Sequence, residues 1–249
     1  MTLHFDHAII AVHDLDAATQ DYRALGFTVM PGGVHANRAT RNALIPFPDG
    51  TYLELLAATG EPPLPDLIDF SVLLQGGEGL VGYALRSNDL EADIARLRAR
   101  GFAVGEIVPG ERRRTDGMMV RWKLALLDGG FAPFLIQDVT PRDRRISRDR
   151  VATTHANRAL GVRGVEIAVR EMAAAWDRYT RLFGLSPEPG DGSRRSIGCV
   201  ALREAITTTE SESDETLVAL HLVFERGADE RLARASTHGV RFRQFAPVD

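Results

Sequence analysis

An internal repeat constrains the fold of this chain more than any other feature of its sequence. A shift of 75 residues places the pair Asp89-Leu90 on Asp14-Leu15, and the pair Gly101-Phe102 then falls on Gly26-Phe27. Between these pairs, both copies carry apolar residues at the spacing of an amphipathic helix that begins at the aspartate and ends at the glycine. Self-similarity at a fixed period marks a repeated structural unit, so we expect the chain to build at least two copies of one motif.

Each copy of the repeat has the same predicted order of elements, which is a strand, a helix and then three strands. The first copy opens with a β-rich strand over residues 4–12 and contains a hairpin turn at residues 48–50. The second copy opens at residues 81–85 and turns at residues 128–130. A weaker third round begins at residue 165. We therefore predict an α+β fold of tandem β-α-β-β-β modules, with mixed sheets and outer helices.

A polar, charged run separates the first two modules from the last part of the chain. The sequence TPRDRRISRDR over residues 140–150 is too hydrophilic for a core and indicates a surface linker. We therefore divide the chain into a domain of two modules over 1–139, a linker over 140–161 and a second, degenerate β-α-β-β-β-like region over 162–249. In that region we expect strands at 165–169, 197–202, 217–224 and 240–245, helices at 172–182 and 228–238, and a low-complexity loop at 207–215.

Charge and cysteine content exclude several classes of function. The chain has 30 basic and 34 acidic residues, a balance too even for the concentrated basic field of a nucleic-acid-binding protein. Its one cysteine excludes an intramolecular disulfide framework and fits a reducing compartment. No apolar stretch approaches the length that spans a membrane, and the first residues do not read as a secretory leader. We expect a cytoplasmic protein whose partner is neither nucleic acid nor a membrane.

Four short motifs occur together within residues 5–57, namely FDHAIIAVHDL, GGVH, NALI and DGTYLEL. In this combination they resemble the glyoxalase-like subfamily of the vicinal oxygen chelate superfamily. The resemblance weakens toward residue 160, and beyond it only the rhythm of strands and helices matches. It implies that paired modules curl their sheet into a cup that opens to a small-molecule ligand. It also implies a divalent metal that is chelated by two vicinal oxygens of that ligand.

The resemblance places metal ligands on the first and fourth strands of each module. In the first module these positions hold His7 and Glu54, on otherwise apolar strands where an ionisable group needs a cavity, a partner or a metal. An imidazole and a carboxylate suit Zn, Fe, Mn, Ni or Co. The second module offers Gly82 in place of the histidine, and Ile136 or Gln137 in place of the carboxylate. The candidates to complete a metal site are His35, His155 and His221.

The five-residue sequence HANRA occurs twice, over residues 35–39 and 155–159. Chance identity of this length is rare in a chain of this size, so the repeat predicts a shared role. In one interpretation His35 and His155 face a single cavity as neutral imidazoles, and binding falls as the pH drops through roughly 6 to 7. In the other, each segment forms its own loop, with the asparagines as turn residues. We favour the first interpretation for the histidines and the second for the asparagines.

We expect an enzyme of lyase or isomerase type that acts on a small oxygenated metabolite by metal-assisted chelation and proton transfer. In this interpretation Glu54 and His35 are catalytic, and His7 and Glu54 bind the metal. The expected substrate-binding residues are Asn42, Tyr52, Trp122 and His155.

Two other interpretations stay open. One is a protein of the bleomycin-resistance type that binds or sequesters a small molecule without chemistry, which an aromatic lining from Tyr52, Trp122 and Phe134 favours. The other is an assembly module whose cup is filled by its own side chains. A homodimer fits each interpretation, because exposed sheet edges favour self-association.

Overall fold

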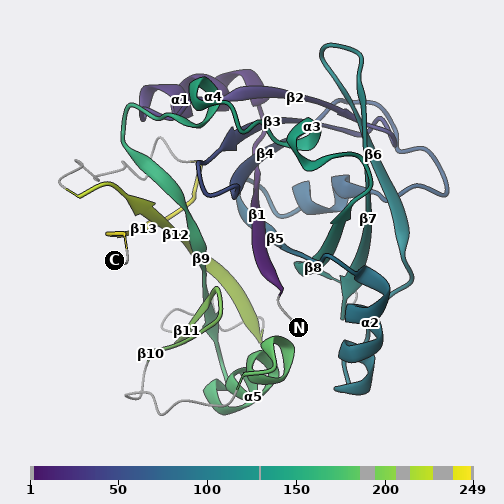
Figure 1. Ribbon diagram of the computed structural model, residues 1–249, viewed down its shortest axis with the longest axis vertical. Coiled ribbons are helices and arrows are strands. Elements are labelled where there is room, and N and C mark those ends of the chain that lie inside the picture. The colour runs from purple at the N-terminus through teal and green to yellow at the C-terminus, as the bar shows by residue number, and fades with distance from the viewer. Residues whose placement is uncertain (1–2, 129, 186–193, 206–213, 227–237, 248–249) are drawn as a thin grey trace.

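The computed structural model describes residues 3–128, 130–185, 194–205, 214–226 and 238–247. Its first two modules follow the predicted repeat (Figure 1). The first module comprises β1 (His4–Ala11), α1 (Leu15–Ala24), β2 (Met30–His35), β3 (Thr40–Pro46) and β4 (Tyr52–Ala58). The 3-10 helix η1 (Phe70–Leu74) leads to the second module, which comprises β5 (Gly79–Arg86), α2 (Leu90–Ala99), β6 (Val108–Arg114), β7 (Met119–Leu127) and β8 (Gly130–Asp138).

The aspartates of the sequence repeat begin both module helices. The carboxylates of Asp14 and Asp89 accept hydrogen bonds from backbone N–H groups in the first turns of α1 and α2. Gly26 and Gly101 follow the two helices with φ angles of 84° and 86°, a region that a side chain disfavours. Local sequence therefore sets the start and the end of each helix, as predicted.

The eight strands of the two modules form a closed barrel in the order β1-β4-β3-β2-β6-β7-β8-β5. The modules meet at two seams, where β1 pairs antiparallel with β5 and β2 pairs antiparallel with β6. At the second seam His35 lies opposite Arg112. The predicted α+β architecture is confirmed, and the expected cup is a barrel that closes on itself.

Alternation of side chains along the strands gives the barrel two different faces. On β1, His7 and Ile9 point into the barrel, whereas Ala8 and Ile10 belong to the large core outside it. That core lies between the barrel, α1 and the last third of the chain. The inner face carries a smaller apolar cluster into which polar groups are set. The barrel interior is therefore the place where buried polar side chains gather.

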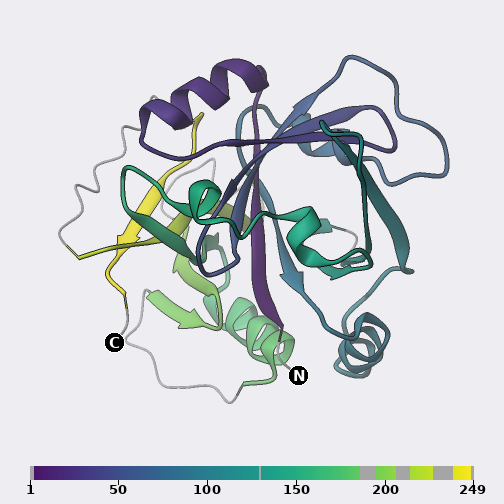
Figure 2. The same ribbon diagram turned by 45° about the horizontal axis from the view of Figure 1, so that its top comes forward.

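The last third of the chain forms a second sheet that packs on the outside of the barrel. Its elements are β9 (Ala159–Val169), α5 (Met172–Phe183), β10 (Arg194–Ile197), β11 (Val200–Glu204), β12 (Glu215–Phe224) and β13 (Phe242–Phe245), in the sheet order β10-β11-β9-β12-β13. β9 contacts β1, and β12 contacts β5. Figure 2 shows α1 above the yellow strand β13, and the nearby rings of Phe27 and Phe242 are 6.4 Å apart.

Some expected boundaries differ from the structure. The strand expected at residues 197–202 is a hairpin of β10 and β11. The helix expected at 228–238 and the loop expected at 207–215 fall almost entirely outside the described residues. In the part of the chain that is described, no helix is both long and apolar enough to cross a bilayer.

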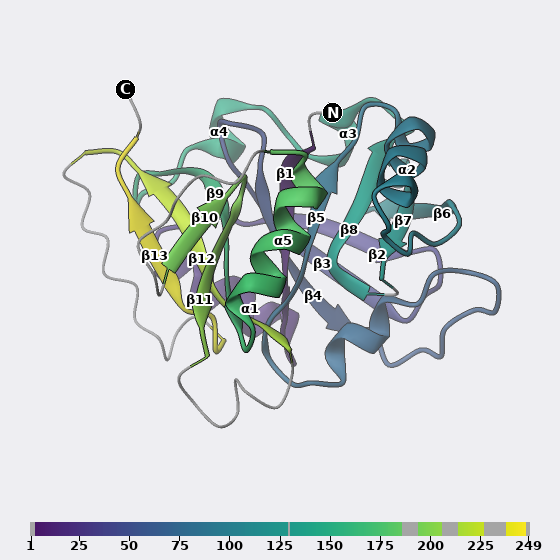
Figure 3. The same ribbon diagram turned by 90° about the horizontal axis from the view of Figure 1, so that it is seen from below.

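Residues 140–150, which we predicted to be a surface linker, have six exposed side chains, and two side chains, those of Arg145 and Ile146, are buried. They contain the short helix α3 (Arg142–Arg145), and α4 (Arg150–Thr153) begins at their end. Arg145 is only 4% exposed, because it forms ion pairs with Asp6 of β1 and Asp138 of β8. A charged side chain within such a run can be buried where its charge is paired by partners from distant parts of the chain. Figure 3 shows α3 near one end of the barrel and the blue segment of η1 near the other.

Candidate active site

The barrel interior holds a cavity of about 20 Å³, which is room for one water molecule or a single reacting atom. Six of the seven residues that the sequence predicted for the site line this cavity, and none of the six is more than 7% exposed. Both modules contribute to its wall. The lining residues are His7, Ile9, His35, Asn42, Tyr52, Glu54, Phe70, Arg112, Trp122, Phe134, Ile136 and Arg145.

Glu54 lies at the centre of the polar groups in this cavity. Its Oε2 is 3.4 Å from Nε2 of His7, and its Oε1 is 3.7 Å from Nε2 of His35. The side-chain amide of Asn42 donates a hydrogen bond of 2.6 Å to Oε1. The carboxylate from β4 is therefore flanked by an imidazole from β1, an imidazole from β2 and an amide from β3.

The surroundings of Glu54 keep its carboxyl group ionised. Burial alone would raise the pKa of Glu54, but His35, His7, the Asn42 hydrogen bond and Arg112 together lower it below its ordinary value. Burial lowers the pKa of His35 from 6.5 to about 4. His35 is therefore neutral at neutral pH, and the groups that still favour the Glu54 carboxylate there include the Asn42 amide and the Arg112 guanidinium.

The ring of His7 is held from both sides. Its Nδ1 is 2.8 Å from the carboxylate of Asp6, its face stacks on Tyr52 at 4.5 Å, and Phe134 meets it edge-on at 5.7 Å. A carboxylate can only accept a hydrogen bond, so Nδ1 carries a proton and donates it to Asp6. The other nitrogen, Nε2, is then directed at Glu54.

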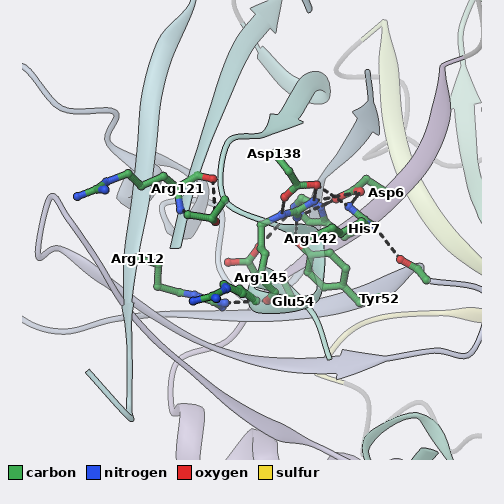
Figure 4. A network of polar contacts seen from close by, with 12 residues as sticks. Asp6, His7, Tyr52, Glu54, Arg112, Arg121, Asp138, Arg142 and Arg145 are labelled. Carbon is green, nitrogen blue, oxygen red and sulfur yellow. Dashed lines mark hydrogen bonds and ion pairs between the residues drawn. The ribbon is translucent and has the colours of Figure 1, made fainter. Parts of the chain in front are cut away.

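A buried ion-pair network supports Asp6 at this end of the barrel (Figure 4). The Nη1 of Arg145 donates to Asp6 at 2.9 Å and to the hydroxyl of Tyr52 at 2.6 Å. Arg145 also pairs with Asp138, and Arg142 pairs with both aspartates. Burial alone would raise the pKa of Asp6, but Arg145, His7 and Arg142 lower it well below its ordinary value. Two guanidinium groups and two carboxylates thus neutralise one another behind His7.

Arg112 is a site residue that the sequence analysis did not identify. It reaches the cavity from β6, where its Nη1 donates to Asn42 Oδ1 at 3.0 Å and its Nη2 donates to the backbone carbonyl of Arg145 at 2.9 Å. Its side chain is 3% exposed, and its Nε–H has no acceptor among the described residues. An unsatisfied buried donor on a cation is costly, so it marks a place where a ligand oxygen would be stabilised.

The GGVH motif makes room for these groups. A Cβ on Gly32 would lie 2.0 Å from Asn42 Oδ1 and 2.8 Å from Nη1 of Arg112. Gly33 has a φ of 146°, and a Cβ there would lie 1.9 Å from the carbonyl oxygen of Arg113 across the seam. The first glycine therefore admits the side chains of the site, and the second admits the neighbouring strand.

The two HANRA segments form the same turn. In each, the asparagine side chain accepts a hydrogen bond from the backbone N–H two residues later, at 3.2 Å for Asn37 and 3.1 Å for Asn157. The following arginines, Arg38 and Arg158, have φ angles of 67° and 62°. These are turn geometries that asparagine stabilises, in agreement with the interpretation that we favoured for this residue.

His155 does not reach the cavity, which corrects its expected place beside His35. Its Nδ1 accepts a hydrogen bond from the backbone N–H of Thr28 at 2.9 Å, and its Nε2 donates to the carbonyl of Pro46 at 3.0 Å. Both ring nitrogens are thus used to attach α4 and β9 to the first module. His221 also lies elsewhere, 3.4 Å from Glu166 on the second sheet.

The donors in the cavity do not fit a catalytic metal. His7, His35 and Glu54 approach one another, but among the described residues no group of three or more His, Cys, Asp or Glu side chains is arranged to hold a metal ion. The wall from β8 presents Phe134 and Ile136, which carry no donor. Gln137 turns to the backbone of residues 88 and 90. Catalytic metals are usually held by about three protein ligands, so this cavity falls short of that requirement.

Comparison with known sequences gives one family and no curated relative. A family described as a glyoxalase-like domain matches residues 5–183 of this chain. No curated protein matches.

Three solved structures are similar to this chain to different extents. A hypothetical protein from Staphylococcus aureus is 16% identical, with 99% of this chain and 100% of that chain covered at a TM-score of 0.77. A fusion protein of a xylose isomerase-like TIM barrel and a 4-hydroxyphenylpyruvate dioxygenase is 16% identical, with 89% and 36% covered at 0.50. A methylmalonyl-CoA epimerase from Streptomyces coelicolor is 29% identical, with 56% and 100% covered at 0.39. The first likeness shows that the arrangement of barrel and second sheet recurs in another protein.

Replacing Gly32 by alanine should disturb Asn42 and Arg112 together. The added methyl group has no space, so we expect a loss of about 1 to 3 kcal/mol in the free energy of unfolding, measured with urea. Gly76→Ala is the matched control, because nothing lies within 4 Å of a Cβ at that position. Equal stabilities for the two variants would show that the site does not depend on Gly32.

The pKa of His35 predicts a loss of stability in mild acid. The pKa of about 4 in the folded chain lies below the ordinary 6.5. Between these two pH values His35 is protonated in the unfolded chain but not in the folded chain. Stability should therefore fall as the pH drops from about 6.5 toward 4, lower than the range of 6 to 7 expected from sequence. In a plot of the urea midpoint against pH, His35→Asn should reduce the slope over this pH range. His4→Asn, at an exposed position, should leave the slope unchanged. Parallel curves for all three proteins would contradict the assignment.

Proposed function

Because this chain belongs to the glyoxalase-like domain family, we propose that its barrel cavity is the active site of a lyase- or isomerase-type enzyme that transfers a proton on a small oxygenated metabolite. In this proposal Glu54 is the base, and His7 and His35 are the imidazoles that position and share its proton. Asn42 and Arg112 bind a substrate oxygen. Tyr52 and Trp122 line the path of the substrate.

The facing pair of His7 and Glu54 carries the proposal. Since His7 Nδ1 donates its proton to Asp6, the remaining ring nitrogen, Nε2, is directed at the Glu54 carboxylate at 3.4 Å. A single proton between Nε2 and the carboxylate can be bonded to either group. The pair is therefore suited to take a proton from a substrate and to give it back.

The chemistry that this arrangement supports begins at a carbon next to a carbonyl group. Glu54 takes the proton from carbon, the C–H electron pair forms a C=C bond, and the carbonyl electrons move onto oxygen. Arg112 would stabilise that negative oxygen through its free Nε–H. Return of the same proton from Glu54 regenerates the substrate, whereas replacement of that proton from solvent before its return exchanges the hydrogen on carbon. Inversion requires that an acid other than Glu54 protonates the opposite face of the carbon.

A specific observation favours a second candidate function. Tyr52, Trp122 and Phe134 all line the cavity, as a site for an aromatic or apolar ligand would require. In this alternative the chain binds a small molecule without reaction. The two candidates differ in whether the protein exchanges a substrate proton.

The test uses hydroxyacetone, a small molecule with two vicinal oxygens, in D₂O. Under the enzyme proposal the protein accelerates deuterium incorporation at carbon, followed by ¹H NMR, and Glu54→Gln lowers the rate at least about 100-fold because it removes the base. Exposed Glu106→Gln is the control and should keep the full rate. Binding without any exchange in the unaltered protein would favour the second candidate instead.

The donor set also predicts the metal content. Protein purified without added ions or chelators should hold far less than one divalent ion per chain, measured by mass spectrometry of the elements. Treatment with EDTA should leave the exchange rate unchanged. A stoichiometric ion that disappears in His7→Ala and Glu54→Gln would contradict this assignment and restore the metal role implied by the resemblance.

A further inference from the structure

A second, larger cavity lies directly behind one wall of the active-site cavity. Its volume is about 250 Å³, against about 20 Å³ inside the barrel. The two cavities have two lining residues in common, His35 and Phe70. No vicinal oxygen compound fits the inner space alone, so a substrate that reaches Glu54 must extend beyond it.

Phe70 forms the part of the common wall that does not belong to a strand. It is the first residue of η1, and it is 6% exposed among the apolar residues at the inner end of the barrel. Its ring lies 4.9 Å from the ring of His35. His35 is fixed by a strand and by the hydroxyl of Thr40, 2.8 Å from its Nδ1, whereas η1 is a single short turn between loops. Rotation of Phe70 would therefore connect the two cavities without disturbing the barrel.

The segment before η1 is attached to the barrel through the first HANRA turn. The side-chain amide of Asn37 donates to the carbonyl of Ile68 at 2.8 Å, and the carbonyl of Asn37 accepts from the backbone N–H of Leu64 at 3.0 Å. The same turn carries His35 at its start. One loop thus holds both the imidazole next to Glu54 and the segment that carries Phe70.

The chemistry of the outer cavity selects an uncharged group. Leu67, Ile68, Pro109 and Ala36 supply apolar surface, and no lysine or arginine lines the cavity. The one carboxylate, that of Glu111, is paired with Arg121 at 3.1 Å. A phosphate or carboxylate would find no cation here, whereas an alkyl or aryl group would be removed from water.

We propose that the outer cavity binds the apolar, uncharged tail of the substrate, and that Phe70 is the specificity-determining partition through which the oxygenated end passes to Glu54. This inference rests on the proposed function for the identity of the reacting end. The substrate class is then a small vicinal hydroxycarbonyl compound with an alkyl or aryl tail.

The partition is tested without any ligand by acrylamide quenching of Trp122, which lines the inner cavity and is 6% exposed. Trp176→Phe leaves Trp122 as the single tryptophan of the chain. In that background, Phe70→Ala should raise the quenching constant at least about threefold, and Phe70→Leu should raise it less. Leu67→Ala, which enlarges only the outer cavity, is the control and should leave quenching unchanged.

Circular dichroism and a cooperative urea transition show which variants are folded. Phe70→Leu keeps most of the apolar volume, so it reports on the partition even if Phe70→Ala does not fold. Unchanged quenching in the folded Phe70 variants, or an equal rise in Leu67→Ala, would overturn the partition.

The tail site is tested with unbranched 1-hydroxy-2-alkanones of three to about eight carbons, titrated against Trp122 fluorescence. Affinity should rise about fourfold for each added methylene until the outer cavity is full. Ala36→Phe, which fills that cavity, should abolish the gain, whereas Val72→Phe on the exposed face of η1 should not. Affinity independent of chain length would overturn the tail site. These titrations measure binding and need no turnover. They can therefore support the tail site even if the exchange experiment contradicts proton transfer by Glu54, and they can contradict the tail site even if exchange is observed.

Discussion

The buried carboxylate of Asp6 is the charge on which the site depends. It is fully buried, and a carboxylate in that position is tolerated only when it is paired and hydrogen-bonded. Arg145 and Arg142 supply the countercharge, and His7 supplies a donor. The pairing therefore settles three things together. It fixes which nitrogen of His7 faces Glu54, it holds the hydroxyl of Tyr52 through Arg145, and it brings α3 onto the end of the barrel. Without Asp6, Arg145 and Arg142 would each lose one of the two carboxylates that pair with them.

Much of the fold and part of the site could be predicted from the sequence, because both depend on patterns among residues that are close together in the sequence. Helix caps at Asp14 and Asp89 and the period of two along β1 and β4 place His7 and Glu54 on one inner face. Arg112 could not be found in this way, since the ERRR run of β6 gives no apolar alternation and its partners come from β3 and residue 145. Arg145 was missed for a related reason. Its charge is compensated by Asp6 and Asp138, which lie 139 and 7 positions earlier in the chain. Local composition does not reveal such partners.

The duplicated HANRA sequence shows how far identity of sequence determines identity of role. Both copies adopt one turn, because the asparagine bond and the left-handed arginine are local properties. The histidines differ, since their surroundings are set by whatever the turn is packed against. His35 faces the interior of a barrel, where burial lowers its pKa, whereas His155 uses both ring nitrogens to attach backbone segments. The side-chain amides of the asparagines also have different partners, because Asn37 attaches the segment before η1 and Asn157 attaches the end of α1.

The seam at which β2 meets β6 places His35 directly opposite Arg112, so neither module contains the whole site. The repeat boundary is therefore not a boundary of function. A gene fragment that ended at residue 139 would encode every strand of the barrel and still leave Asp6 without its guanidinium partners. The cavity therefore requires the charged run after β8 as well as both modules, and a chain that lost either module would lose part of the cavity wall.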